Sequence, residues 1–241
     1  MPDFVRLWVY LSSAPLVGLT ATLGVYLLTT AAYQRLRQAA WANPVLWSIV
    51  VLGGGLLVTG LPYPSYFAGA QFIHFLLGPA VVAMGLPLWE RRAILVRHWG
   101  RFLAAALAGG GIAAISAVAI GWAVGLPDDV LRSLAPKSVT APVAMGVAEK
   151  IGGVPALAAV FAVLTGLVGA LSGRYLFALL GITPNRLGWM ARGFAMGTAA
   201  HGIGAARSLQ VDADAGAYAS LALGLQVLLA SLVIPLVARF F

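Results

Sequence analysis

The composition of this 241-residue chain excludes an ordinary soluble domain. Hydrophobic residues make up 61% of it and charged residues only 9%, whereas soluble domains contain about 45 to 50% apolar and about 25% charged residues. The net charge of +8 does not indicate a nucleic-acid partner, because arginine and lysine gather in short segments between apolar stretches, as topology signals do. We also expect no metal site and no cofactor, since cysteine is absent and acidic and histidine residues are few.

Long charge-free intervals predict an all-α, multi-pass membrane protein. They cover residues 7–34, 38–89, 102–127, 151–173 and 215–238. A helix needs about 20 apolar residues to cross roughly 30 Å of hydrocarbon, so each interval holds one crossing and the second interval holds two. Together with two further segments described below, they form a single transmembrane domain over residues 1–241.

In chain order, we expect seven crossings, with a Pro-rich turn after the second. They are predicted over residues 8–32, 44–61, 72–89, 102–125, 154–180, 193–209 and 217–238, with the turn at 62–66. Basic residues gather at 33–43, 90–101 and 181–192, which the positive-inside rule places together on the cytoplasmic side. Gly78 and Pro79 are expected to kink or interrupt the third crossing.

Residues 130–153 do not fit a simple crossing. Two short helical candidates flank a break at Pro136–Pro142, and each is too short to span a bilayer. We expect a re-entrant hairpin or broken helix, because irregular backbone at membrane depth requires protein or water around it. The sequence Val-Ala-Met-Gly also occurs at both 82–85 and 143–146. This match either arises by chance or indicates inverted repeats over 1–125 and 126–241, as in secondary transporters.

The break contains a candidate anion site. Pro142 suits the first turn of a helix, with Thr140 or Ala141 as its cap. A helix N-terminus presents unpaired N–H donors and partial positive charge, to which nearby side chains add an ammonium and hydroxyl groups. We therefore predict that Pro136 breaks the helix and that a carboxylate or phosphate binds at Lys137, Ser138, Val139, Thr140 and Pro142. The alternative is a surface loop whose Lys137 extends to lipid headgroups.

A second break is predicted in the sixth crossing, beginning at Gly197. Glycines on both sides of His201 would let the helix unwind and expose backbone carbonyls next to a side chain type that titrates near neutral pH. The predicted substrate contacts are Thr198, His201, Gly202 and Gly204, and His201 is the possible proton carrier. The alternative is close helix packing through glycine and alanine, with His201 as a packing residue.

No motif for hydrolase, protease or nucleotide chemistry occurs, so we do not expect an enzyme. Instead, several motifs resemble the LrgB/CidB family along essentially the whole chain. They are GPAVVAMGLPL at 78–88, PKSVT at 136–140, IGGVP at 151–155, TGLVGA at 165–170 and HGIG at 201–204. The chain departs from the family pattern at Ala141, Ala200 and Ala205, where hydroxyl residues are frequent.

The resemblance implies a multi-pass protein of the bacterial inner membrane, often made beside a small LrgA/CidA-type membrane protein. The family was described as holin/antiholin-like and linked to control of murein hydrolase activity and autolysis. It is also similar to the membrane domain of the plastidal glycolate/glycerate translocator, and bacterial relatives are linked to uptake of pyruvate-like acids.

Two functions therefore compete. The first is a proton-coupled secondary transporter of glycolate, glycerate, lactate or pyruvate, which binds substrate at the two helix breaks. The alternative is a holin/antiholin-like regulator acting with an LrgA/CidA-type partner. In either case we expect a homodimer surrounded by membrane lipid. Because an unpaired lysine at membrane depth costs about 2.5 to 3.5 kcal/mol, Lys137 is expected to reach an aqueous vestibule.

Overall fold

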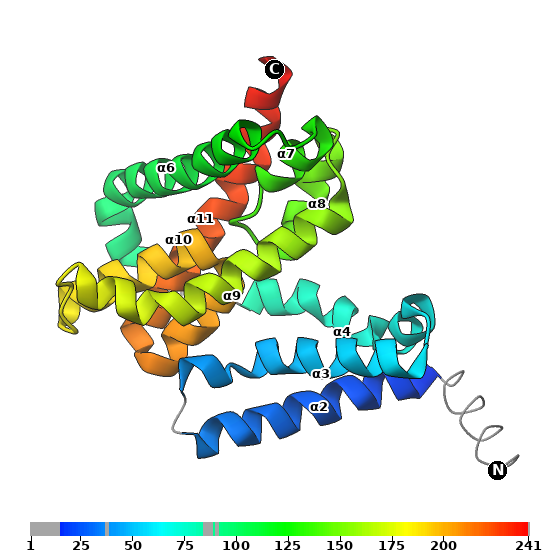
Figure 1. Cartoon of the computed structure of the whole chain (residues 1–241). Helices are drawn as coiled ribbons and strands as arrows, with labels where there is room; N and C mark the ends of the chain where they lie inside the picture. Colours follow the sequence, from blue (N-terminus) through cyan, green and yellow to red (C-terminus); the bar gives the residue numbers. More distant parts are fainter. Residues whose placement is uncertain (1–14, 37–38, 84–88, 90–91, 241) are drawn as a thin grey trace, which may run out of the picture. The chain divides into compact units, whose positions relative to one another are not determined.

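The computed structural model describes residues 15–36, 39–83, 89 and 92–240, and all regular structure in these residues is helical. The chain forms two compact units, residues 1–83 and 84–241. The first unit contains α2 (Pro15–Arg35), α3 (Pro44–Thr59) and α4 (Tyr63–Ala83) (Figure 1). The second contains α6 (Arg92–Ala123), α7 (Asp128–Leu134), α8 (Ala141–Lys150), α9 (Pro155–Leu179), α10 (Arg186–Val211) and α11 (Ala213–Val237). The all-α prediction is confirmed, whereas the single domain and the repeats stay predictions.

The described helices also confirm the membrane class. Four of them are long and apolar enough to cross a bilayer, over Leu16–Arg35, Val96–Ala123, Pro155–Leu179 and Ala213–Phe240. A shorter apolar helix covers Pro44–Thr59. The count of seven crossings stays a prediction, and part of the first and third predicted crossings lies outside the described residues.

In the first unit, α2 packs against both α3 and α4. The backbone of α2 lies so close to α4 at Gly18 that an added Cβ atom would collide with the carbonyl oxygen of Tyr66. Polar side chains link the same helices, with Thr22 Oγ1 2.6 Å from Tyr66 Oη and Thr29 Oγ1 2.9 Å from Ser48 Oγ. Small residues and hydroxyl pairs are the usual means of helix association in membranes.

Three predicted features of the chain need correction. The turn is not at 62–66, because Gly60 ends α3 in the left-handed conformation (φ 66°) and α4 already begins at Tyr63. The predicted interruption at Gly78 and Pro79 is wrong, because both lie within α4, whereas the alternative of a kink there stays a prediction. Proline removes only its own N–H donor, so the neighbouring turns can continue. The basic segment 90–101 is helical from Arg92 onward, with a non-helical residue at His98.

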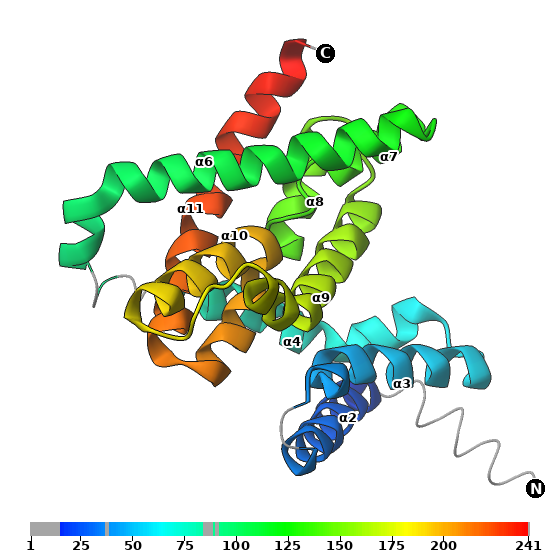
Figure 2. The ribbon, with the colours of Figure 1, turned by 60° about the vertical axis from the view of Figure 1, so that its left-hand side comes forward.

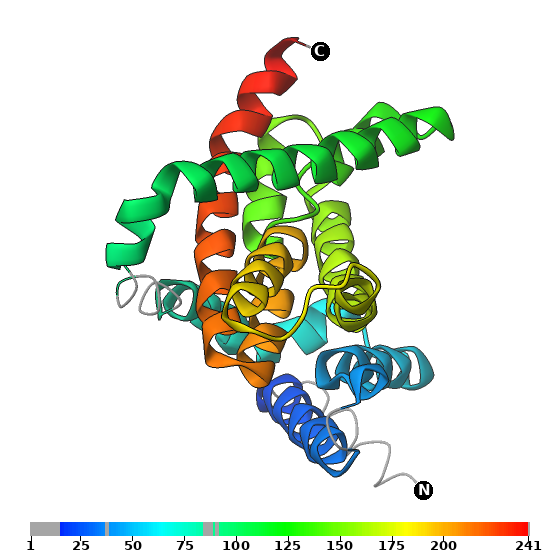
Figure 3. The same ribbon diagram turned by 90° about the vertical axis from the view of Figure 1, so that its left-hand side faces the viewer.

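In the second unit, glycines set the distance between α10 and its neighbours. An added Cβ atom on Gly193 or Gly197 would collide with the backbone of α11, at the carbonyl oxygens of Ala215 and Ala219. On another face, Gly169 of α9 lies against Ala200 of α10. Helix α6 crosses α11 (Figure 2, Figure 3). The packing alternative for the glycines of α10 therefore holds at Gly193 and Gly197.

Candidate functional site

The first break separates α7 from α8, as the sequence predicts. After α7 the chain makes two tight turns, in which Lys137 N donates to Leu134 O at 3.1 Å and Val139 N donates to Pro136 O at 3.2 Å. Helix α8 then starts at Ala141, with Thr140 as its N-cap and a proline in its first turn. The helix start predicted from Pro142 is confirmed, although the Pro142 side chain itself is exposed.

Polar groups of this break lie inside the protein. Ser138 is 7% exposed and Val139 is 2% exposed, whereas Lys137 and Thr140 are half-buried. The Lys137 ammonium donates to Ser138 Oγ at 3.3 Å. Thr140 caps α8 by position only, since its buried Oγ1 makes no hydrogen bond to any described residue. A buried hydroxyl without a partner costs about 1 to 3 kcal/mol, which a polar ligand would relieve.

The second break falls on His201, inside the predicted break over 198–204, whereas the break residue predicted at Gly197 is not one. Gly197 is helical, because its missing side chain serves the contact with α11 rather than a backbone break. His201 has φ 40° and ψ −131° and is the one residue in α10 with non-helical angles. Positive φ is unusual for a residue with a Cβ atom and persists only where the surroundings hold it.

The side chain of His201 packs against residues of α9. It is 3% exposed, and Nε2 lies 2.7 Å from the carbonyl oxygen of Ala162. Because a carbonyl only accepts, Nε2 carries the proton and donates it. A Cβ atom on Gly166 would come within 2.8 Å of the ring, so the imidazole lies directly against the backbone of α9 at this glycine.

The two breaks meet in the fold. A Cβ atom placed on Gly202 would lie 3.8 Å from Thr140 Cγ2. Ala162, whose carbonyl accepts from His201, packs in one buried cluster with Val139 of the first break. The structure thus brings together segments 61 residues apart, counted from 140 to 201, at the N-terminus of α8.

Not every predicted site residue joins this contact. Gly204 is buried against the two preceding turns of its own helix, at Ala200 and Met196. Thr198 is buried with its methyl group toward α6, where a Cβ atom on Gly109 would lie 2.9 Å away. Its Oγ1 makes no hydrogen bond to a described residue, so α10 also contains an unsatisfied hydroxyl, three residues before the break at His201.

The residue that sequence analysis missed is Gln226 of α11. It is 4% exposed, and its Nε2 donates to the carbonyl oxygen of Ala106 on α6 at 2.6 Å. A Cβ atom on Gly110 would overlap the Gln226 carboxamide. One signal was available, because Gln226 is the single amide side chain in the charge-free interval 215–238.

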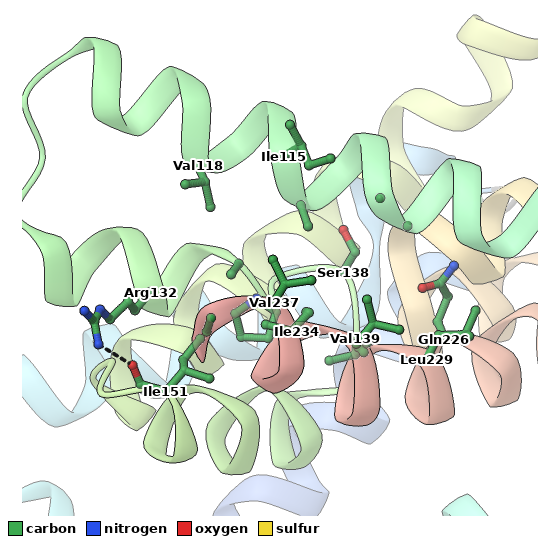
Figure 4. A pocket seen from close by; sticks show the side chains of 18 of the residues that line it. Ile115, Val118, Arg132, Ser138, Val139, Ile151, Gln226, Leu229, Ile234 and Val237 are labelled. Atoms are coloured by element: carbon green, nitrogen blue, oxygen red, sulfur yellow. Dashed lines mark hydrogen bonds between the residues drawn. The ribbon is translucent and has the colours of Figure 1, made fainter. Parts of the chain in front are cut away.

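A cavity of about 600 Å³ lies between α6, the first break and α11 (Figure 4). Its walls are mostly aliphatic side chains of α6 and α11, and Ser138 and Val139 of the break contribute to them. Arg132 of α7 also lines the cavity, and it donates to the carbonyl oxygen of Ile151 at 2.8 Å. The site predicted from sequence therefore borders a space that the sequence did not indicate.

Comparison with known proteins points to one family. The model of the LrgB-like family matches residues 22–240. The chain is 33% identical to the uncharacterized protein YwbG of Bacillus subtilis (strain 168), over 93% of this chain and 98% of that protein. It is 32% identical to the uncharacterized protein YxaC of the same organism, over 91% and 94%, and 30% identical to an uncharacterized protein of Haemophilus influenzae, over 82% and 84%. No solved structure matches.

Proposed function

The chain belongs to the LrgB-like family, and from this premise we propose that it is a secondary carrier of small monocarboxylates of the glycolate, glycerate, lactate or pyruvate class. The substrate binds where the two helix breaks meet. Transport is coupled to protons and proceeds by alternating access around this site. The observation that carries the proposal is the proximity of Thr140 to Gly202, because it brings a helix N-terminus next to a second interrupted helix, as in transporter sites.

The first break supplies the groups that a single carboxylate needs. Carboxylate oxygens only accept hydrogen bonds, and the break presents the donors of the Lys137 ammonium and the Thr140 hydroxyl beside the N-terminus of α8. The Thr140 hydroxyl has no partner within the described chain, so a bound carboxylate gives it one. The partial positive charge of the helix terminus adds to the attraction.

The second break supplies a proton-carrying group. His201 Nε2 is engaged by the carbonyl oxygen of Ala162, which leaves Nδ1 to accept and release the proton. The strained backbone at His201 gives α10 a point at which its two halves can change angle. Proton binding at His201 and substrate binding at the first break thus occur on either side of the place where Thr140 lies near Gly202.

The first test replaces Lys137 by methionine, which keeps the length of the side chain and removes its donors. Uptake of labelled glycolate, lactate or pyruvate into proteoliposomes under a pH gradient is expected to fall about 10- to 100-fold, because a hydrogen bond to a charged group contributes about 1.5 to 3 kcal/mol. Lys150→Met is the matched control, since Lys150 is exposed at the far end of α8, and it should retain uptake within about twofold of the original.

Other outcomes point away from a carrier. If the unmodified protein shows no saturable flux of any of these acids, the transport proposal is wrong. Release of large solutes regardless of their carboxyl group would instead favour the holin/antiholin-like function with an LrgA/CidA-type partner. Equal loss of uptake in Lys137→Met and Lys150→Met would mean that the loss does not arise from a carboxylate site in the break.

A second test uses the buried hydroxyls that have no partner, Thr140 and Thr198. Replacing either by valine removes an unsatisfied group, so we expect equal or higher thermal stability without substrate. Transport should nevertheless fall at least about tenfold in Thr140→Val, because this hydroxyl is lost to the substrate. Thr30 of α2 also has a buried hydroxyl without a described partner, and Thr30→Val should raise stability while leaving transport unchanged. A loss of stability together with transport at Thr140 would contradict a ligand-directed role.

A further inference from the structure

Two charged side chains of opposite sign line one end of the cavity between α6 and α11. They are Asp128 and Arg132, which lie four residues apart on α7 and therefore on one face of that helix. Figure 4 shows Arg132 at one end of the cavity and Gln226 toward the other. The guanidinium of Arg132 donates from Nη1 to the carbonyl oxygen of Ile151 and makes no other hydrogen bond or ion pair with the described residues. Most of its five N–H donors are therefore available to a ligand.

The charged end of the cavity coincides with the end of a candidate membrane span. The apolar span in α6 covers Val96–Ala123, and Trp122 at its end lines the cavity and is 74% exposed. Tryptophan is enriched where membrane helices pass the lipid headgroups. The charged end thus lies at the level of the headgroups, and the rest of the cavity extends along α6 into the hydrocarbon.

The apolar part of the cavity is long and open along its side. Its wall on α6 reaches from Ala106 to Trp122, which is about 24 Å at 1.5 Å per residue. Half of the hydrocarbon of a bilayer is about 15 Å thick. Ile115, near the middle of this wall, lines the cavity and is nevertheless 71% exposed. A side-open apolar space of about 600 Å³ and this length fits one acyl chain of the surrounding lipid.

Beyond the proposed transport site, we infer that this cavity binds one acyl chain of a phospholipid whose headgroup is the zwitterionic phosphoethanolamine. The Arg132 guanidinium donates to the phosphate, a pairing that suits the planar fork of arginine. The ammonium of the headgroup donates to the carboxylate of Asp128. A phosphoglycerol headgroup has only the negative charge, which Asp128 repels, and the quaternary nitrogen of phosphocholine has no N–H to donate. The second acyl chain remains in the bilayer.

Native mass spectrometry of the purified protein tests the headgroup. The probes are phosphatidylethanolamine, phosphatidylcholine and phosphatidylglycerol with identical acyl chains. One phosphatidylethanolamine should bind at least about tenfold more tightly than either other lipid, the usual effect of one hydrogen bond to a charged group. Asp128→Asn should abolish its preference over phosphatidylglycerol, whereas Asp129→Asn, at a residue that does not line the cavity, should retain it. Equal affinity for the three lipids, or an unchanged preference in Asp128→Asn, would overturn the inference.

A variant on α6 tests the location of the acyl chain. Ala114 lines the cavity, so Ala114→Phe should fill part of it and weaken phosphatidylethanolamine binding at least about tenfold. Ala108 is exposed on the same helix and does not line the cavity, and Ala108→Phe should leave binding unchanged. Glycerophosphoethanolamine, which has the headgroup but no acyl chains, should not compete. Competition by this headgroup alone, or normal lipid binding in Ala114→Phe, would refute the inference. A dimer that Ala114→Phe dissociates would likewise refute it, because a second copy of the chain would then occupy the cavity.

Discussion

Replacement of His201 by glycine is expected to abolish carboxylate transport and yet to leave a more stable protein than replacement by alanine. Both variants lose the imidazole and its hydrogen bond to Ala162. They differ in the backbone, because φ at position 201 is 40°, which glycine adopts freely and alanine does not. The difference in stability should be about 1 to 3 kcal/mol in favour of glycine.

Thermal unfolding in detergent and uptake in proteoliposomes measure the two effects separately. Ala199→Gly is the matched control, since Ala199 is an exposed helical residue of α10. It should lower stability by about 1 kcal/mol, the usual penalty for glycine in a helix, and retain transport. If His201→Gly transports normally, His201 is a packing residue. If His201→Ala is as stable as His201→Gly, the backbone at position 201 is not strained.

Replacement of Gly197 by alanine is expected to prevent folding or to reduce stability by several kcal/mol. The added methyl group would collide with the backbone of α11 at Ala219, and backbone cannot move aside as a side chain tip can. Overpacking of this kind typically costs about 1 to 3 kcal/mol and occasionally more. Helices α10 and α11 also position Thr198 and Gln226, so their separation disrupts both the break and the cavity.

Folded yield and thermal stability in detergent measure this effect. Gly146→Ala of α8 is the matched control, because a Cβ atom there meets nothing within 4 Å. It should raise stability by about 1 kcal/mol through helix propensity alone. Similar stability of the two variants would mean that α10 and α11 do not pack through Gly197.

Much of the candidate site could be predicted from sequence, because it contains residue types whose structural preferences depend only on their neighbours along the chain. Pro142 and Thr140 located the start of α8 because proline and a hydroxyl residue suit the first turn and the cap of any helix. Lys137 was predicted to be a binding residue because a cation between apolar segments is costly. The same reasoning placed Gly197 wrongly, since glycine serves both backbone breaks and close helix contacts, and the sequence contains no sign of which helix lies opposite.

The sequence by itself determined the membrane class, the helical fold and the polarity of the first break, because each depends on composition or on neighbours along the chain. Only the tertiary structure decided that Thr140 lies near Gly202, that His201 itself takes the non-helical angles within the predicted break, and that Gln226 lines a cavity between α6 and α11. These features depend on which helix faces which. That pairing arises from packing summed over many small residues, none of which specifies its partner alone.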